Sequence, residues 1–406
     1  MTDQLILDGI KRRGKKFAPL LQKLSAQGSG HSSQQELEKL QAEVNQASKL
    51  IPTLSADEKK AKIAELKPIS DRVAVLKKEV AGETAIVVPN IPRDDVPNGD
   101  DESTNVVERE VGKQPNIKNP KDYLALTEDK SLIDLKRASK VSGSRFGYIL
   151  GPVAQLEFAL VQYAQKVLLK EGFTLVVPPV MIKEENMAAM GYLNGGGEDE
   201  TYHFAKDNLY LVGTSEQSIG PMHRDEVFKA EDLPKRYLSF STCFRREAGS
   251  YGKDTKGILR VHQFDKLEMF SITLPEKSDQ EHEFLLAMEE KLMQGLDLPY
   301  RVKKLCTGDL SWPSARTWDI ETWMPGQNVY RETHSTSTTT DYQSRALNIK
   351  IDRGQKKEFV HMLNGTAFAI GRTLIAIIEN YQQSDGSIKI PNVLQPYMHG
   401  LKVIKG

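Results

Sequence analysis

The residues that could do chemistry are charged side chains placed inside otherwise apolar segments. Phe264, Lys266 and Glu268 alternate along one predicted strand, so they share a face of it, because successive strand side chains point to opposite sides. Arg372 lies within an apolar run. Unpaired charge in a half-buried element costs several kcal/mol, so each such group must pair internally or meet a ligand. At any single position the sequence leaves both alternatives open.

The number of such positions favours a ligand. Arginine and glutamate recur on predicted strands or on one predicted helix, at Arg245, Glu247, Glu268, Glu332 and Arg372. Arginines bind phosphates, carboxylates bind an amine or Mg²⁺, and an aromatic ring can stack on a base. Together they predict a site for a nucleotide and a small amine-containing ligand.

Several common catalytic patterns are missing from the sequence. There is no Gly-x-Ser-x-Gly, His-Glu-x-x-His or Walker-type Gly-Lys-Ser/Thr pattern. The eight histidines are scattered, and we interpret His262 as an ordinary strand residue rather than a ligand. The two cysteines, Cys243 and Cys306, lie far apart, which argues against a disulfide framework and against a thiolate zinc site.

The bulk composition is that of a soluble globular protein of two domains. The chain has 406 residues, and its 55 basic residues balance its 55 acidic ones, so any contact with nucleic acid must come from a local patch. No run reaches the roughly 18 apolar residues of a membrane span, and the N-terminus is too polar and acidic for a signal peptide. We therefore expect a cytoplasmic protein with no membrane partner.

The chain up to about residue 85 is predicted to form an antiparallel helical hairpin. Capping-box patterns at 33–36 and 55–58 precede two heptad-like apolar stripes, joined by a short turn that contains Pro52. Pro68 is expected to kink or split the second helix. Two interpretations stay open on pattern alone: a packing or dimerisation element, or an arm that projects and grips something long.

Residues 87–105, rich in proline and acidic side chains, are predicted to be a linker, which divides the chain into domains 1–105 and 106–406. The second domain is predicted to be α+β, with an antiparallel sheet and flanking helices. Its expected helices cover 154–170, 278–296 and 365–383, and its expected strands cover 173–182 (interrupted at Pro178-Pro179), 208–217, 237–244, 261–273, 300–305, 317–325 and 329–338.

Long segments of the chain resemble a known family. FRREAG…RVHQFDKLEMF is similar to motif 2 of the class II aminoacyl-tRNA synthetases, and NGTAFAIGRTLIAIIENYQQSDGSIKIPNVLQPYM is similar to their motif 3. With RASKVSGSRF and LCTGDLSWPSARTWDIETWMPGQNVYRE, they resemble the seryl-tRNA synthetases of the bacterial type. The match runs from the helical hairpin to the C-terminus, nearly the whole chain.

The resemblance implies a fold, a reaction and partners. The fold would be the class II antiparallel-sheet core with an N-terminal helical arm, in a homodimer whose interface includes the segment around Pro178-Pro179. Serine and ATP would form seryl-adenylate in the presence of Mg²⁺. The seryl group would then pass to the 3′ end of tRNA(Ser), with tRNA(Sec) as a further candidate acceptor. The helical hairpin would bind the long variable arm of the tRNA.

The resemblance also assigns roles to residues of this sequence. The catalytic residues would be Arg245, Glu268 and Arg372. Serine would be held by Thr214, Ser215, Glu216, Arg245, Glu268, Asn364 and Thr366. ATP would be held by Arg245, Arg246, Glu247, Val261, Phe264, Glu332, Thr333, His334, Ser335 and Arg372. Mg²⁺ would be held by Glu332 and Ser335. The acceptor end of the tRNA would meet Lys253, Lys256 and Arg260.

The sequence departs from the family pattern in three places. MGYLNGGGEDETYHF, residues 190–204, is acidic and glycine-rich where many relatives have a Gly-Gln-Leu-Pro-Lys-like segment. Glu332-Thr333-His334-Ser335 replaces a more usual Glu-Ile/Val-Ser-Ser, so Ser335 must supply the hydroxyl ligand. Thr366 stands where serine is usual. The alternatives are a paralogue that charges a carrier protein, which would lack the arm, and an inactive relative, which would have lost Arg245, Glu268 or Arg372.

Overall fold

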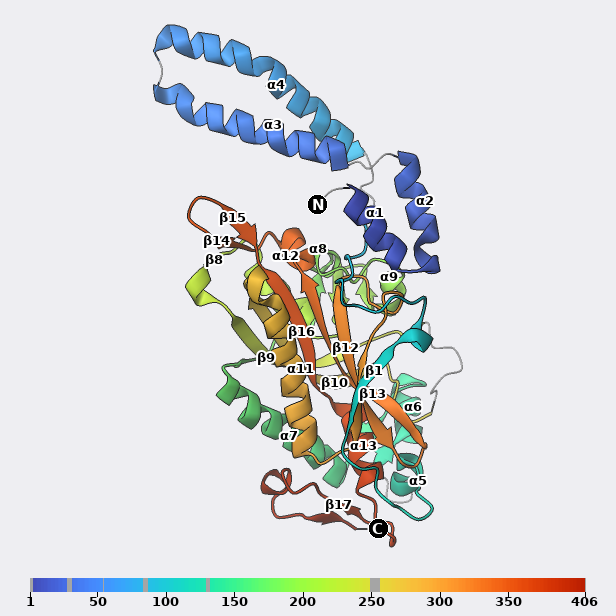
Figure 1. Cartoon of the computed structure of the whole chain (residues 1–406). Helices are drawn as coiled ribbons and strands as arrows, with labels where there is room; N and C mark the ends of the chain where they lie inside the picture. Colours follow the sequence, from blue (N-terminus) through green and yellow to red (C-terminus); the bar gives the residue numbers. More distant parts are fainter. Residues whose placement is uncertain are drawn as a thin grey trace. The chain divides into compact units, whose positions relative to one another are not determined.

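The computed structural model describes residues 3–27, 31–53, 55–82, 87–128, 132–248 and 256–405. They form two compact units, which divide between Ile91 and Pro92 (Figure 1). The larger part of the predicted linker, residues 92–105, belongs to the second unit, where the Arg93 amide donates to the Ala315 carbonyl at 2.9 Å. None of the described helices is both long and apolar enough to cross a membrane.

The first unit is helical. Its elements are α1 (Asp3–Arg12), η1 (Lys15–Phe17), α2 (Ala18–Gln27), α3 (His31–Leu50), η2 (Ile51–Thr53) and α4 (Ala56–Gly82). Helices α3 and α4 lie side by side, and Arg72 on α4 makes a two-pronged ion pair with Glu36 on α3, at 2.8 and 3.0 Å. The predicted antiparallel hairpin is therefore confirmed.

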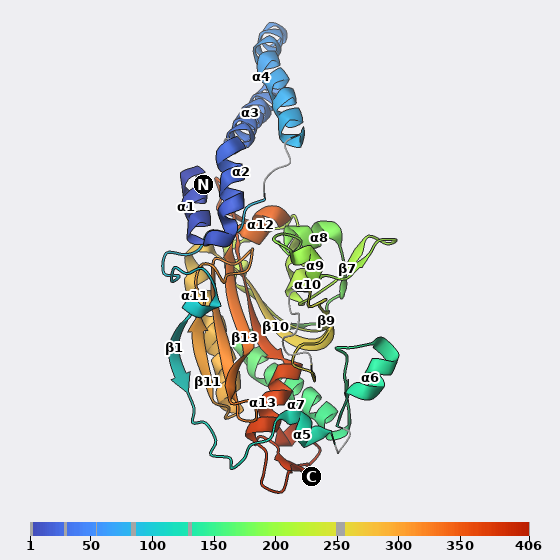
Figure 2. The same ribbon diagram turned by 90° about the vertical axis from the view of Figure 1, so that its right-hand side faces the viewer.

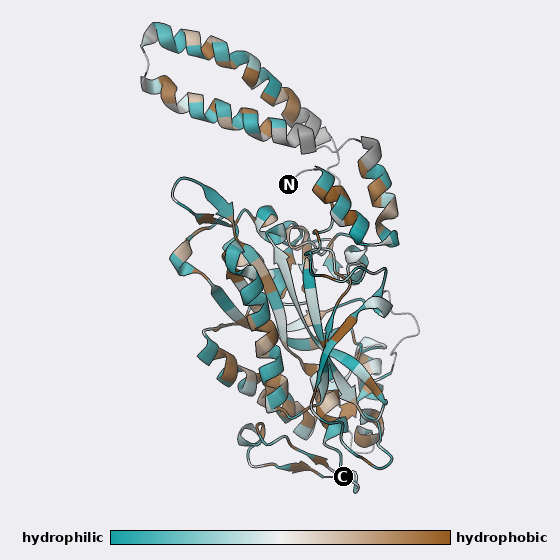
Figure 3. Ribbon diagram, viewed as in Figure 1, coloured by the Kyte–Doolittle hydropathy of each residue, from teal (hydrophilic) through white to brown (hydrophobic). Residues whose placement is uncertain are grey.

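The hairpin is held by a narrow apolar seam. Ala47, Leu66, Val73 and Leu76 are buried, while hydrophilic residues cover most of both helices (Figure 3). Ile63, predicted to belong to the seam, is instead exposed, because α4 turns that side chain toward solvent. Short seams of this kind stabilise a pair of helices along one stripe only.

The predicted ends of the hairpin helices are partly right. The capping box at the start of α4 is confirmed, since the Ser55 amide and hydroxyl both donate to Glu58, at 2.9 and 2.6 Å. Helix α3 begins at His31, so Ser33 lies inside the helix and the predicted cap there is wrong. Helix α4 runs through Pro68 without a break, so Pro68 does not split it.

The second unit is built on an eight-stranded sheet that is antiparallel except for its last pair. In spatial order the strands are β1 (Val106–Val111), β11 (Tyr300–Lys304), β12 (Arg316–Met324), β13 (Val329–Thr340), β16 (His361–Ala369), β10 (Gln263–Thr273), β9 (Lys235–Phe244) and β4 (Thr174–Val176). The expected α+β class and antiparallel sheet are confirmed.

Helices flank this sheet. They are α5 (Tyr123–Thr127), α6 (Leu135–Ser142), α7 (Gly151–Leu168), α8 (Glu184–Ala189), α9 (Gly197–Glu200), α10 (Glu216–Ile219), α11 (Ser278–Gly295), α12 (Tyr342–Leu347) and α13 (Ile370–Asn380). Helix α11 packs on β16, β13 and β10. Figure 2 shows α11 and the group α8–α10 on opposite sides of the central strands, so the sheet separates α11 from that group.

Short strands complete the second unit. Two three-stranded sheets join β5 (Met181–Lys183), β7 (Leu209–Leu211) and β6 (His203–Phe204), and β15 (Lys357–Phe359), β14 (Lys350–Asp352) and β8 (Val227–Lys229). Two pairs join β2 (Ile133–Asp134) with β3 (Tyr148–Ile149), and β17 (Ile388–Lys389) with β18 (Val403–Ile404).

Two sequence predictions need correction in this unit. The helix expected over 365–383 begins only at Ile370, because the preceding residues form β16 and pair with both β10 and β13. The pattern Ser278-x-x-Glu281 at the start of the helix expected over 278–296 predicts a capping box, and α11 does not form it. The Glu281 carboxylate binds Arg236 at 2.7 Å, and Lys277 rather than Ser278 is the cap residue.

Candidate active site

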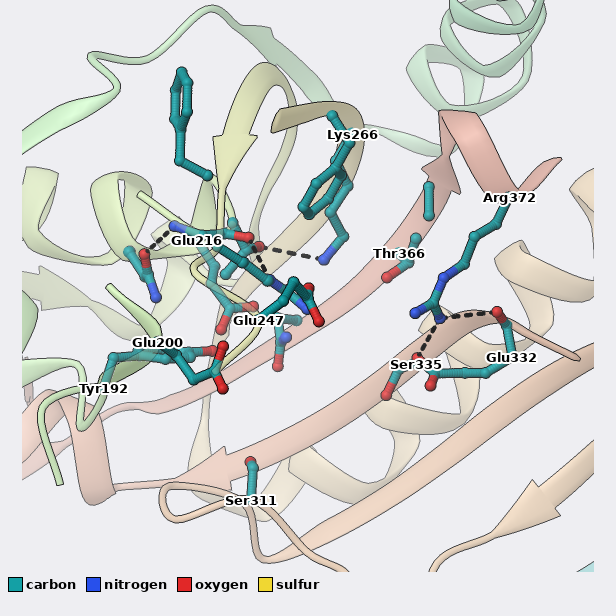
Figure 4. A pocket seen from close by; sticks show the side chains of 18 of the residues that line it. Tyr192, Glu200, Glu216, Glu247, Lys266, Ser311, Glu332, Ser335, Thr366 and Arg372 are labelled. Carbon is teal, nitrogen blue, oxygen red and sulfur yellow. Dashed lines mark hydrogen bonds and ion pairs between the residues drawn. The ribbon is translucent and has the colours of Figure 1, made fainter. Parts of the chain in front are cut away.

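Most of the predicted site residues meet in one cavity of about 540 Å³ on the sheet (Figure 4). Its walls come from strands β9, β10, β13 and β16, from α13 and from the loops between them. The predicted residues that line it are Thr214, Glu216, Arg245, Glu247, Arg260, Val261, Phe264, Glu332, Thr333, Ser335, Asn364, Thr366 and Arg372. Residues separated by more than 150 positions in the chain thus face one space.

One end of the cavity, which we call the serine end after the ligand that the resemblance implies, is built around the buried carboxylate of Glu268. Strand β10 places it on the same face as Lys266, whose Nζ lies 2.5 Å from Glu268 Oε2. Lys266 also donates to Thr214 Oγ1 at 3.2 Å, and Asn364 Nδ2 lies 3.4 Å from Glu268 Oε1. The two alternatives that the sequence left open therefore both apply at this position. Lys266 and Glu268 are paired with each other in the interior, and Lys266 also lines the cavity, where a ligand can contact it.

Glu216 completes this end from the start of α10. It is 1 % exposed, and its Oε2 has no hydrogen-bond partner among the described residues. Burial, and then the nearby charge of Glu268, raise the pKa of Glu216 to about 8. A buried carboxyl with an unmet oxygen is suited to receive an ammonium group, which would satisfy both its charge and its hydrogen bonding.

The opposite end of the cavity, the nucleotide end, is more open. Arg372 Nη1 donates to the Glu332 carbonyl at 2.9 Å and lies 3.3 Å from Glu332 Oε1. Burial works against the charged carboxylate, but Arg372 and Arg245 outweigh it and hold the pKa of Glu332 below its ordinary value. These arginines offer fixed positive charge to a polyphosphate.

Arg245 lies between the two ends. Its Nε donates to the Gly213 carbonyl at 3.1 Å, and its guanidinium carbon lies 5.4 Å from the centre of the Phe264 ring. Next to it, Glu247 adopts a left-handed backbone (φ 54°) and accepts a hydrogen bond from Arg260 at 3.1 Å. The Phe264 ring provides a flat apolar surface on which a base can stack.

A strand irregularity brings Glu332 and Ser335 to the same cavity. They are three residues apart, an odd spacing that would put them on opposite faces of a regular strand. The register of β13 against β12 shifts between Glu332 and His334, so Thr333 is an extra residue and the faces exchange. As a result both Glu332 and Ser335 line the cavity.

The donor set at this position fits a magnesium ion. Mg²⁺ is held by one or two carboxylates together with substrate phosphates and water. Glu332 supplies a carboxylate and Ser335 a hydroxyl, and Asp319 lies across from Ser335 on β12 with its Oδ1 buried and unpartnered among the described residues. The described part of the chain holds no cluster of three His, Cys, Asp or Glu side chains suited to a metal.

Other predicted site residues lie outside the cavity. The Ser215 hydroxyl is buried against Ser239 at 2.5 Å. Arg246 is exposed, with its guanidinium carbon 5.5 Å from the Tyr202 ring centre. His334 faces the interior, where its Nε2 hydrogen-bonds the Ala367 carbonyl at 3.0 Å. Lys256 is exposed, and Lys253 lies outside the described residues.

The structure adds wall residues that sequence reasoning missed. Tyr192, Gly197 and Glu200, from the acidic glycine-rich segment, line the cavity together with Ser311. The Arg246 amide donates to the Glu200 carbonyl at 2.9 Å, which ties this segment to the motif 2 region. The unusual composition of this segment is the one feature of the sequence that could have marked it as part of the site. Its position in the cavity wall depends on long-range packing, which the sequence does not reveal.

The role of Lys266 at this end was also missed, although its place on the face of Phe264 and Glu268 was predicted. His262 lies just before β10 rather than in the strand, and its Nδ1 hydrogen-bonds with the Arg245 carbonyl at 3.0 Å. It therefore supports the backbone of the loop that carries Arg245.

Comparison with known proteins points to one family. Residues 201–381 match the class II tRNA synthetase core domain (G, H, P, S and T). The chain is similar to the serine–tRNA ligase of Dictyoglomus turgidum, with 44% identity over 90% of this chain and 88% of that protein. The serine–tRNA ligase of Petrotoga mobilis is 40% identical over 97% of this chain and 96% of its own length.

Solved structures give the same result. The seryl-tRNA synthetase of Pyrococcus horikoshii, complexed with ATP, is 36% identical, with a TM-score of 0.83 over 99% of this chain and 97% of that one. The cytoplasmic serine–tRNA ligase of Naegleria fowleri, in complex with AMP, is 33% identical, with a TM-score of 0.83 over 99% of this chain and 95% of that one. The similarity extends over both units.

Proposed function

The chain belongs to the family of seryl-tRNA synthetases, and we propose that its pocket carries out the chemistry while its helical hairpin binds the tRNA. It is an ATP-dependent ligase that activates L-serine as seryl-adenylate and transfers the seryl group to the 3′ end of tRNA(Ser). The observation that carries the residue assignments is the single cavity in which a buried carboxylate end adjoins an arginine-lined end.

At the serine end, Glu216 takes the serine ammonium group. Glu268, which is ion-paired with Lys266, accepts from the serine hydroxyl, and Thr366 and Asn364 close the space around that side chain. A site that hydrogen-bonds a substrate hydroxyl discriminates strongly against analogues that lack it, because its polar groups are then left unpaired. This arrangement supports selection of serine over alanine.

At the nucleotide end, Phe264 and Arg372 hold the adenine between them, with Val261 and Glu247 at its edge. Arg245 neutralises charge on the α-phosphate as the serine carboxylate oxygen attacks the phosphorus and pyrophosphate leaves. Glu332 and Ser335 would hold Mg²⁺, which, when bound, neutralises charge on the phosphates. The chain's own groups act by positioning both substrates, so no protein nucleophile is needed.

Transfer to tRNA assigns a role to the first unit and to the loop between β9 and β10. Arg260 and Lys256, with Lys253, meet the acceptor end there. The hairpin α3–α4 grips the tRNA by its shape and backbone, through exposed lysines such as Lys60 and Lys67.

A charging assay tests the arm. The double variant Lys60→Glu, Lys67→Glu should form seryl-adenylate at the normal rate but charge tRNA(Ser) at least about tenfold more slowly, with the loss reduced at high salt. Undiminished charging would leave the hairpin without this role. Loss of adenylate formation as well would show that the change acts through folding instead.

The chain is further proposed to act as a homodimer. Among the described residues β4 is an edge strand of the sheet, and the apolar side chain of Val177, directly after it, is 78 % accessible. Exposed apolar residues at a sheet edge mark an association surface. Val177→Asp should shift the protein toward monomer in sedimentation analysis, whereas Val403→Asp, also at an exposed apolar position, should not; a dimer in both would contradict this interface.

The reaction sets the proposed location. Both cysteines are buried and free, as expected in a reducing compartment. ATP, serine and tRNA(Ser) meet in the cytoplasm, where we propose that the enzyme works. Fractionation that placed the native protein elsewhere would contradict this.

A further inference from the structure

Three buried carboxyl groups and one ammonium group meet at and beneath the serine end. Glu216 and Lys266 line the cavity, and Glu268 is the fully buried ion-pair partner of Lys266. The third carboxyl belongs to Glu289 on α11, on the other side of the sheet, and it is fully buried. Of the four residues, only Glu216 and Glu268 have an assigned role in serine recognition.

Glu289 reaches the sheet where a glycine leaves room for it. A Cβ atom at Gly365 would lie 3.3 Å from Glu289 Oε1, so the carboxyl group rests directly against the backbone before Thr366. Both of its oxygens lack a hydrogen-bond partner among the residues that the structure describes. Gly365 is the neighbour of a proposed serine contact, which places the acid just behind the serine end.

Full ionisation of this cluster would bury three negative charges against one positive charge. Arg245 at the cavity wall adds a second cation, and Asp319 adds a further carboxyl on the side of Glu289. An uncompensated buried charge costs several kcal/mol, so the cluster must reduce its charge or bind a cation. One unmet oxygen, Oε2 of Glu216, lies at the serine end itself, since it has no hydrogen-bond partner among the described residues.

The direction of the pKa shifts of these acids agrees with this excess of buried negative charge. Burial, followed by the charge of Glu268, raises the pKa of Glu216 to about 8, and the same two causes raise that of Glu289 well above its ordinary value. Lys266 and Arg245 act in the opposite sense on Glu216. The pKa of the buried Cys243 thiol, which also lies near this cluster, is raised to about 11 by burial. In the empty cavity Glu216 therefore carries a proton below about pH 8.

We propose that this enzyme binds serine by exchange: the substrate's ammonium group replaces a proton carried by Glu216, and that proton leaves to solvent. The proposal rests on the assignment of Glu216 as the ammonium acceptor. Lys266 stays paired with Glu268 throughout, and Glu268 accepts from the serine hydroxyl. Glu289 lies behind the Gly365 backbone and has no assigned contact with serine, so the bound ammonium is balanced by Glu216.

The exchange fixes how affinity depends on pH. Serine binds the ionised form of Glu216, so below the pKa of the empty pocket the substrate must expel a proton, and affinity falls by about tenfold per pH unit. Above that pKa the carboxylate is already ionised, and this contribution is constant. The pH window lies near pH 8 because that is the pKa of Glu216 in the empty protein.

Calorimetry of the full-length protein tests the exchange. The probe is seryl-sulfamoyl-adenosine, a stable analogue of seryl-adenylate that keeps the ammonium group, titrated at pH 7 in two buffers with different heats of ionisation. The observed enthalpy should differ between buffers by an amount equal to release of about one proton. A matched probe in which a hydroxyl replaces the ammonium group should bind more weakly, with no buffer dependence.

Each outcome decides between distinct conclusions. Binding of the seryl probe with no proton release would overturn the exchange while leaving the proposed function intact. Failure of the seryl probe to bind would contradict the proposed function itself. Equal proton release with both probes would show that the ammonium group is not what displaces the proton, which also overturns the exchange.

Two variants locate the proton. Glu289→Gln mimics the protonated acid in size and charge, so it should retain proton release and affinity at pH 7, as should Glu283→Gln, an exposed control on the same helix. Abolition of release in Glu289→Gln would move the proton to Glu289 and overturn its assignment to Glu216. Lys266→Met removes a charge that favours ionisation, so it should move the pH midpoint of affinity upward; an unchanged midpoint would contradict the proposed charge balance.

Discussion

The two ends of the active-site cavity handle charge in opposite ways. At the serine end the side chain of Glu268 is fully buried and that of Lys266 is 10 % exposed, whereas at the nucleotide end those of Arg372 and Glu332 are 25 % and 49 % exposed. Water can screen the open end, but the closed end must balance its charges within the protein or with the substrate. Removing a charge should therefore cost most at the serine end.

The largest effect is expected for Lys266→Met, which keeps the length of the side chain and removes its charge. Glu268 would be left buried without its cation, at a cost of about 3–5 kcal/mol. If the whole of this free energy were lost from catalysis, kcat/KM for serine would fall by two to four orders of magnitude. Any part lost from the folded state would appear instead as a lower melting temperature. Serine-dependent ATP–pyrophosphate exchange and thermal melting measure the two parts, and near-normal values of both would contradict the buried pair.

Arg372→Ala tests the open end and should cost less. The variant loses one charged contact to the nucleotide and the ion pair with Glu332, each partly screened by water, so KM for ATP should rise about tenfold to a hundredfold. KM for serine should change by less than about threefold. A larger effect on serine than on ATP would show that the two ends are not separate in function.

Some of this contrast could be predicted from the sequence. The shared face of Phe264, Lys266 and Glu268 follows from the period of two, and the structure confirms it. The joint placement of Glu332 and Ser335 could not be derived in that way, because nothing in the sequence marks Thr333 as the extra residue of a bulge. Only the family resemblance placed those two side chains together.

Long-range packing explains the other features that the sequence did not predict correctly. Glu289 reaches the serine end from the far side of the sheet, and its position depends on Gly365, far along the chain. The run around Ala367 was predicted to be helical because a short apolar segment has no distinctive period; pairing with β10 and β13 makes it a strand. Local pattern supplied the elements, while tertiary contacts decided which of these residues face the substrate.

Arg246→Ala should have the smallest effect. The sequence resemblance groups Arg246 with the ATP contacts, but its guanidinium lies over Tyr202, outside the cavity. An exposed cation over a half-buried ring contributes about 0.5–1 kcal/mol, so KM for ATP should change by less than about fivefold. A rise comparable to that of Arg372→Ala would restore Arg246 to the nucleotide site and narrow the contrast between the two ends.

The most direct test of this account is ATP–pyrophosphate exchange by the full-length protein with serine, threonine and alanine in parallel. The buried Glu268–Lys266 pair requires a substrate hydroxyl, and Thr366 with Asn364 limits the space around it. We predict that kcat/KM for serine exceeds that for either competitor by at least about a hundredfold. Equal exchange with all three amino acids would show that the closed, charged end does not select the substrate.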